Sequence, residues 1–231
     1  MQDVSPRLFG QSSRTFNDEE LKAMVAAAHD SGVKVAVHAQ TCEAISSVLS
    51  LGVDSVEHGC DLYLEPSLVS KFAKSKETTW VPTLSVFYKN ARTSDGWGKA
   101  TQSFQGALRV GMENIACGGD TGAFSHGENA LEMKLMVKLG ADWRKVLKWA
   151  TLGGWELIRP MDWEKHADIP PTQLGDNDIR FGAVRAGFSA DLVAVQGDFE
   201  KDFDGTVDNV QFVMKAGKVY KQDGREFPDG Q

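Results

Sequence analysis

The sequence predicts an α/β fold in which a parallel sheet is followed by a smaller segment of short strands. Helical segments alternate with short apolar runs between residues 17 and 158, and such alternation indicates βαβ units. The apolar runs are hydrophobic on both faces, as expected for strands buried in a parallel sheet. Beyond residue 180 the composition changes to short strand-like runs separated by turn residues, which predicts a small β segment.

The first expected helix covers residues 17–32. Asn17 can cap this helix, Glu20 lies three residues later as in a capping box, and Gly32 supplies a stop. An apolar strand over 33–39 follows the helix. The alternation then continues with helices over 41–51, 66–76 and 99–113 and with strands over 53–58, 78–86 and 114–120.

Two further amphipathic helices are expected over 127–140 and 142–158, and Asp142 is a natural cap for the second. Residues 162–180 contain two consecutive prolines in a polar run, which predicts a loop or insertion. The β segment that follows is expected to contain strands over 190–197, 210–215 and 218–221, with a tight turn at Ala216 and Gly217.

Composition excludes several classes of partner. The chain has 231 residues, 25 Lys and Arg against 32 Asp and Glu, a formal charge of −7 and no block of five like charges. These values argue against nucleic acid and against an anionic membrane as partners. No window approaches the ~20 apolar residues of a membrane helix, and the N-terminus lacks the pattern of an export signal. We therefore expect a cytoplasmic protein, with Cys42, Cys60 and Cys117 as free thiols.

Three predicted strands end in residues that can bind metal, namely His38, His58 and Asp120. In a parallel (β/α) barrel, side chains at the carboxyl ends of the strands converge at one mouth. Two imidazoles and one carboxylate suit zinc, which in catalytic sites keeps one position for water. The bound water then titrates near ~7 and becomes a nucleophilic hydroxide. Asp120 could instead act as the general base that takes the proton from that water.

Other interpretations of these residues remain open. A single histidine after an apolar strand is often a hydrogen-bonded structural residue, so the pair carries more weight than either histidine alone. His126 lies six residues after Asp120 in the segment TGAFSHGEN. A contact with substrate and a helix-entry position without function are both compatible with His126.

Several blocks together resemble the amidohydrolase superfamily, in its imidazolonepropionase-like and prolidase-like branch. The blocks are VKVAVHAQ, GVDSVEHG, WVPTLSV, IACGGDTGAFSHGENALEMKLMVKLG and GAVRAGFSADLVAVQGD with VQFVMKAGKV. By position, the resemblance implies that His38 and His58 are the metal histidines after the fifth and sixth barrel strands. It implies that Asp120, after the eighth strand, touches metal and shuttles protons, and that His126 binds substrate. The family fold is a (β/α)8 TIM-type barrel with a small β domain.

The family pattern also includes an HxH pair on the first strand and a bridging lysine or glutamate on the fourth, and both are missing here. The chain therefore resembles the C-terminal half of such an enzyme. A complete barrel takes about 250 residues, whereas residues 17–158 contain four predicted strands. The predicted domains are a partial barrel over 1–161, the loop or insertion over 162–180 and a small β segment over 181–231.

Two classes of function follow from these observations. The first is a metal-dependent amidohydrolase that hydrolyses amide, cyclic amide or dipeptide-like C–N bonds of small molecules with a metal-activated hydroxide. Its cofactor would be a divalent metal, with zinc the first candidate, and one or two ions as in the family. The alternative is a catalytically inactive half barrel that acts as a binding or assembly module. In both cases the open strand edges are expected to be covered by the N-terminal half or by a homo-oligomer.

Overall fold

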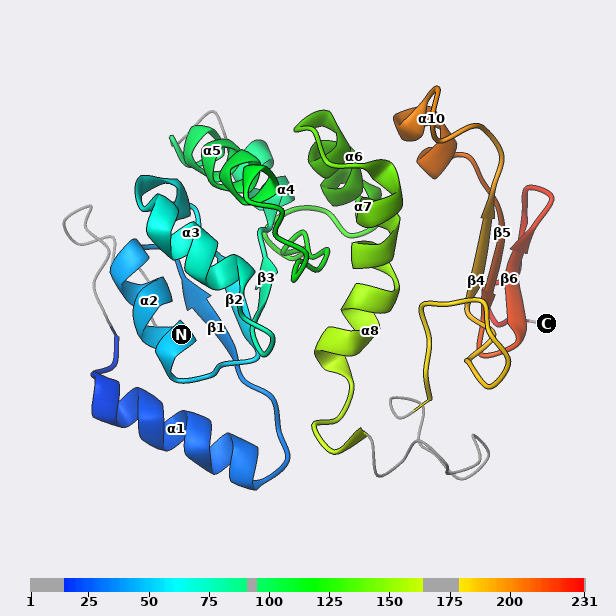
Figure 1. The fold of residues 1–231 in the computed structure, drawn as a ribbon. Helices are drawn as coiled ribbons and strands as arrows, with labels where there is room; N and C mark the ends of the chain where they lie inside the picture. Colours follow the sequence, from blue (N-terminus) through cyan, green and yellow to red (C-terminus); the bar gives the residue numbers. More distant parts are fainter. Residues whose placement is uncertain (1–14, 91–94, 164–178, 231) are drawn as a thin grey trace. The chain divides into compact units, whose positions relative to one another are not determined.

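The computed structural model describes residues 15–90, 95–163 and 179–230. The chain divides into two compact units, residues 1–140 and 141–231. Figure 1 shows the parallel strands in the first unit and the antiparallel strands in the second. The α/β class with a parallel sheet and a separate antiparallel sheet is thus confirmed, and the half barrel remains a prediction.

The first unit is built on a parallel sheet with strand order β1-β2-β3. The strands are β1 (Ala36–Ala39), β2 (Ser55–His58) and β3 (Thr79–Val81). Its helical segments are α1 (Asp18–Asp30), α2 (Cys42–Ser50), η1 (Leu62–Leu64), α3 (Pro66–Ala73), α4 (Leu84–Lys89), α5 (Gly96–Arg109) and α6 (Ala130–Lys138). Helices and strands alternate from α1 to β3, as the sequence predicts.

Local signals explain where the first elements begin. Asn17 and Glu20 form the expected capping box, since each side chain accepts a hydrogen bond from the other residue's backbone N–H. Thr41 caps α2 through the N–H of Ala44, and Pro66 opens α3. The core between sheet and helices consists of fully buried apolar side chains, among them Ile45, Val48, Val56, Leu62, Phe72, Trp80 and Phe104.

Two predicted strands of this unit are shorter than expected. The strand predicted over 78–86 ends at Val81, and its last part belongs instead to α4. The reason is local, because Pro82 cannot donate to a strand ladder and Thr83 adopts a left-handed conformation with φ of 50°. The strand predicted over 114–120 is reduced to one parallel bridge between Ile115 and Trp80.

The second unit contains an antiparallel sheet with strand order β4-β5-β6-β7. The strands are β4 (Leu192–Val195), β5 (Val210–Lys215), β6 (Lys218–Gln222) and β7 (Arg225–Glu226), and the helices include α7 (Trp143–Ala150), α8 (Leu152–Ile158) and α10 (Phe203–Asp208). Ala216 and Gly217 both have positive φ, so the predicted tight turn between β5 and β6 is confirmed.

The single helix predicted over 142–158 is divided at Thr151, whose backbone has φ of −118° and ψ of −90°. Gly182 packs against this break, where an added Cβ would lie 2.6 Å from the carbonyl carbon of Thr151. Aromatic contacts also join these helices to later residues. Trp143 stacks on Phe199, and Trp155 contacts Phe188.

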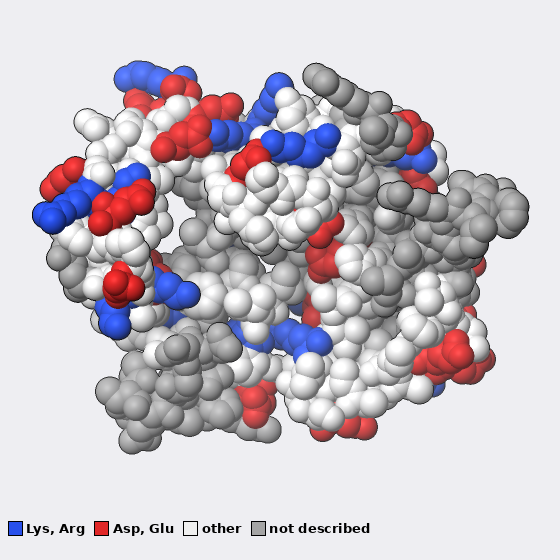
Figure 2. All heavy atoms as spheres, turned by 180° about the vertical axis from the view of Figure 1, so that it is seen from behind, with Lys and Arg blue, Asp and Glu red and all other residues white. Residues whose placement is uncertain are grey.

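These contacts lie within the second unit, residues 141–231. The domain bounds predicted at residues 161 and 180 stay predictions. Most of the loop or insertion predicted over 162–180 lies outside the described residues. None of the described helices is long and apolar enough to cross a bilayer. On the face shown in Figure 2, acidic and basic side chains of described residues are intermixed, without a continuous basic patch.

Candidate active site

His38 and His58 lie next to each other at the carboxyl ends of two neighbouring parallel strands. Ala39 of β1 pairs with His58 of β2, so the strand register brings the two histidines to the same end of the sheet. His38 Nδ1 lies 2.5 Å from His58 Nε2, and the rings stack with centroids 4.7 Å apart. The structure therefore brings together two of the residues that the sequence singled out.

The backbone and ring of His58 are held by several contacts. Its φ is 74°, which turns the chain at the end of β2, and its carbonyl accepts a hydrogen bond of 3.0 Å from Trp80 Nε1. Its Nδ1 lies 2.8 Å from Thr83 Oγ1. The next residue, Gly59, has a φ of 67°, which favours glycine. A Cβ at this position would also lie only 2.8 Å from Trp80 Nε1.

Burial makes His58 a neutral imidazole. The side chain is 8% exposed. Burial, and to a smaller extent the neighbouring His38, lower the pKa of His58 to about 4, and the charge of Asp120 opposes this lowering. Since a ligating imidazole must be unprotonated on the donor nitrogen, this environment suits metal binding near neutral pH.

Asp120 is exposed and follows Gly118 and Gly119, with φ of 62°. Its charge acts on His58 and also on Glu57, a residue that the sequence analysis did not single out. Burial is the main cause that raises the pKa of Glu57, Asp120 adds to it, and a hydrogen bond from Ser55 opposes it. Asp120 thus acts electrostatically on the region around the histidine pair.

His126 is exposed on the segment between Asp120 and α6. Within the described part of the chain, no hydrogen bond joins it to His38, His58 or Asp120. Residues 15–90, 95–163 and 179–230 also contain no group of three or more His, Cys, Asp or Glu side chains arranged to hold a metal ion. The metal ligation assigned to His38, His58 and Asp120 and the substrate contact assigned to His126 therefore stay predictions.

No protein-family model and no curated protein match the sequence. Solved structures do match. A Xaa-Pro dipeptidase with methionine bound in its active site is 29% identical, with a TM-score of 0.71 over 90% of this chain and 50% of that chain. A. niger ochratoxinase is 24% identical, with a TM-score of 0.70 over 95% of this chain and 49% of that chain. Phenylurea hydrolase B is 18% identical, with a TM-score of 0.66 over 94% of this chain and 50% of that chain.

The chain spans about half the length of each of these structures. It resembles the C-terminal half of an amidohydrolase-superfamily protein. The resemblance expected from the sequence blocks is confirmed, and the ochratoxinase and phenylurea hydrolase matches establish a shared fold. All three matched structures carry the names of hydrolytic enzymes.

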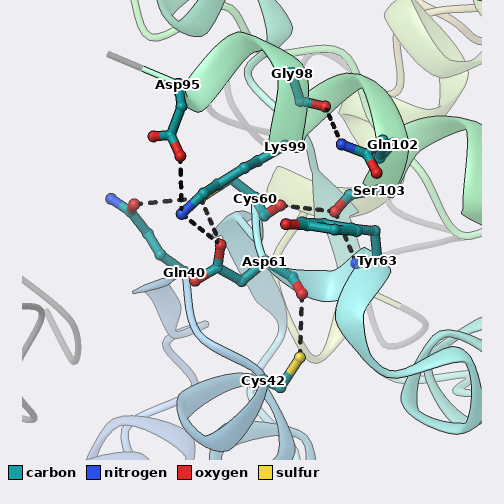
Figure 3. Close-up of polar contacts among 10 residues, drawn as sticks. All are labelled: Gln40, Cys42, Cys60, Asp61, Tyr63, Asp95, Gly98, Lys99, Gln102 and Ser103. Carbon is teal, nitrogen blue, oxygen red and sulfur yellow. Dashed lines mark hydrogen bonds and ion pairs between the residues drawn. The ribbon is translucent and has the colours of Figure 1, made fainter.

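In this amidohydrolase-like half, a polar network ties the loops after β1 and β2 to α5 (Figure 3). Lys99 Nζ lies 3.3 Å from Asp61 Oδ1 and 3.6 Å from Asp95 Oδ2. Ser103 Oγ donates to the carbonyl of Cys60 at 2.8 Å. The loop that directly follows His58 is therefore held by contacts to α5 that do not involve the histidine rings.

The thiols near this network are free, as the sequence predicts. Cys42 Sγ donates to the carbonyl of Asp61 at 3.1 Å, and Cys60 is buried. Burial first, and the charge of Asp61 second, raise the pKa of Cys60 to about 12. The Cys60 thiol stays protonated at neutral pH, and we assign it a packing role.

Besides Glu57, sequence reasoning missed Thr83 and Glu132, which lie at or near the candidate site. Thr83 contacts His58 only because the chain turns after Val81, where a continuous strand was predicted. The Glu132 carboxylate accepts hydrogen bonds from the first two residues of α4, which lie 48 and 47 residues earlier in the sequence. Pro82 is a local signal that points to the turn, whereas the contact of Glu132 has no local sequence signal.

Proposed function

We propose that this chain is part of a metal-dependent hydrolase of amide-type C–N bonds. One observation carries the proposal, namely the pair of imidazole nitrogens that face each other at the carboxyl ends of β1 and β2. In (β/α) barrel enzymes the catalytic side chains lie at the carboxyl ends of the parallel strands. The likeness to the Xaa-Pro dipeptidase over 90% of the chain supports the same chemistry.

The donor set suits a divalent ion, with zinc the first candidate. His38 Nδ1 and His58 Nε2 face each other at 2.5 Å, and imidazole nitrogens are ligands that zinc accepts. The second nitrogen of His58 already contacts a hydroxyl, as the second nitrogen of a ligating histidine usually contacts a polar partner. When bound, the ion would supply a hydroxide nucleophile near neutral pH.

The protein's own residues have separate roles in this proposal. His38 and His58 hold the ion, and the Asp120 carboxylate completes the set contributed by this chain. Asp120 Oδ also takes a proton from the attacking water and delivers it to the leaving nitrogen. His126, on the exposed segment that follows, contacts the substrate. The substrates are small molecules with an amide, cyclic amide or dipeptide-like bond.

We further propose that another polypeptide segment completes the barrel. The chain spans about half of each matched structure, and β1 lies at an edge of its sheet. An N-terminal half or a second copy of the chain would cover such an edge. The four missing strands would also bring the remaining ligands of the metal site.

The test is hydrolysis of a panel of dipeptides and N-acyl amino acids by zinc-loaded protein, with the polypeptide that supplies the other strands present. Wild type and His29→Ala, a control in which a distant imidazole is removed, should hydrolyse at least one member. His58→Ala should reduce that activity by 10² or more, roughly the loss of one charge-stabilising group. Absence of hydrolysis across the panel, or full activity in His58→Ala, would contradict the proposal.

A further inference from the structure

Glu132 is a buried carboxylate that lies outside the histidine pair. It belongs to α6, is 2% exposed, and accepts three hydrogen bonds. Oε1 accepts from the N–H of Leu84 at 2.9 Å, and Oε2 accepts from the N–H and the hydroxyl of Ser85, both at 2.7 Å. Both of its oxygens are therefore committed to the first two residues of α4.

This contact replaces the ordinary cap of α4. The first N–H groups of a helix have no partner within the helix, and a Thr at the position before it normally caps one of them. Thr83 occupies that position but makes no such bond. Its hydroxyl lies instead 2.8 Å from His58 Nδ1. Glu132 satisfies the helix amides, which leaves the Thr83 hydroxyl to the histidine.

Thr83 is also held in an unfavourable backbone conformation. Its φ of 50° and ψ of 45° are left-handed, which is uncommon for a β-branched residue. Such a conformation persists only where its surroundings enforce it. The neighbouring residues are fully enclosed, since Leu84 and Ser85 are 0% exposed. The three hydrogen bonds that Glu132 accepts come from the two residues that directly follow Thr83.

We propose that Glu132 is a positioning residue that fixes the orientation and tautomer of His58 through Thr83. With the α4 amides bonded to Glu132, Thr83 Oγ1 accepts the Nδ1–H of His58. Nε2 of His58 is then the unprotonated nitrogen and faces His38 Nδ1. A neutral imidazole carries one proton, so a partner at one nitrogen decides the state of the other.

This inference deepens the proposed function, because it rests on the use of Nε2 as the donor nitrogen. Its test is made on metal-free protein, so that a failure to bind metal or to hydrolyse amides does not affect the readout. The readout is the tautomer of His58 in the full chain, from long-range proton–nitrogen correlations of the imidazole rings at about pH 8, where ordinary histidines are neutral. The signals of His58 are assigned by their absence in His58→Gln.

The main variant is Glu132→Gln, which keeps the shape of the side chain and removes its charge. The matched control is Glu128→Gln, which makes the same chemical change at an exposed residue that pairs with Lys89. We expect wild type and control to show mainly the Nδ1–H tautomer. In Glu132→Gln the ratio of Nδ1–H to Nε2–H should fall about three- to tenfold, as for the loss of one hydrogen bond.

Thr83→Val and Thr83→Ser test the path from Glu132 to His58. Thr83→Val should reproduce the shift, and Thr83→Ser should keep the wild-type ratio because it retains the hydroxyl. If Glu132→Gln does not fold, Ser85→Ala, which removes one bond to the carboxylate, should give a smaller shift in the same direction. An unchanged tautomer ratio in Glu132→Gln, even if that variant is less stable, would overturn the proposal. An unchanged ratio in Ser85→Ala or in Thr83→Val would overturn it as well.

Discussion

The two sheets of this chain differ in how their strands are buried. In the parallel sheet β2 is buried at three of its four positions, and His58 ends it. In the antiparallel sheet three of the four residues of β4 are exposed, with Val193 at 64%. The difference shows that the first unit holds its strand ends in a dense core, where a small change can move a functional side chain. In the second unit β4 presents apolar side chains to solvent, and buried side chains such as Val146 and Trp149 lie on α7 instead.

The largest expected effect compares one apolar side chain from each unit. Phe104→Ala removes a fully buried ring that contacts Trp80 in the first unit, and should lower the free energy of unfolding by about 3–5 kcal/mol. Val193→Ala, on the exposed strand, should change it by less than about 0.5 kcal/mol. Urea unfolding followed by tryptophan fluorescence measures both. Equal losses would contradict the contrast between the sheets.

The second prediction concerns pH and a carboxyl group from each unit. Burial raises the pKa of Glu132 from 4.5 to about 7, although Ser85 and Leu84 oppose it with hydrogen bonds. The folded chain therefore binds more protons than the unfolded chain between these values. The contribution of Glu132 to stability is fully present below pH 4.5 and is lost as the pH rises through about 7.

The free energy of unfolding of wild type, relative to Glu132→Gln, should accordingly fall by about 3 kcal/mol across this window. Burial first, and the charge of Glu132 second, raise the pKa of Cys117, so Cys117→Ser in both backgrounds serves as a check. Asp198 in the second unit is exposed, and a hydrogen bond from Lys201 lowers its pKa. Asp198→Asn should leave the slope between pH 4.5 and 7 unchanged. A wild-type curve parallel to that of Glu132→Gln would refute the prediction.

The third prediction tests the close packing next to Asp120. A Cβ at Gly118 would lie 2.6 Å from Val81 Cγ1, whereas a Cβ at Gly98 would meet nothing within 4 Å. Gly118→Ala should destabilise the chain by about 1–3 kcal/mol. Gly98→Ala, within α5, should instead stabilise it by about 0.5–1 kcal/mol. Thermal and urea unfolding give both values, and the same sign for the two variants would argue against the packing described.

The smallest expected effect comes from an exposed ion pair near Glu132. Lys89 pairs with Glu128, and the two side chains are 35% and 42% exposed. Glu128→Gln should cost no more than about 1 kcal/mol, and less at high salt. A loss well above about 1 kcal/mol, or a loss that does not shrink with added salt, would contradict the weak contribution expected of an exposed ion pair.

Regular elements of the fold could be predicted from local signals, and irregular ones could not. The capping box at Asn17, the stop at Gly32 and the turn at Ala216 and Gly217 are short-range features, and the structure has all three. The sequence predicts residues 84–86 as the end of a strand, whereas they form the first half of α4. Its true conformation depends on Pro82, on the strained Thr83 and on a carboxylate from α6.

In the candidate site too, some residues have local sequence signals and others do not. His38 and His58 could be predicted because each ends an apolar strand, and parallel pairing brings such ends together. Glu57 and Glu132 could not be singled out, because their importance comes from burial that only the folded chain creates. Glu132 is surrounded in sequence by an ordinary amphipathic helix, where a glutamate usually lies on the solvated face.

The most direct test of the central claim is the metal-to-protein ratio of the purified chain after zinc loading and desalting, measured by plasma mass spectrometry. Wild type and the control His29→Ala should each retain about one zinc per chain, and the double variant His38→Ala, His58→Ala should retain none. Equal zinc in wild type and double variant, or none in any of the three, would contradict the claim that the facing histidines form a metal site.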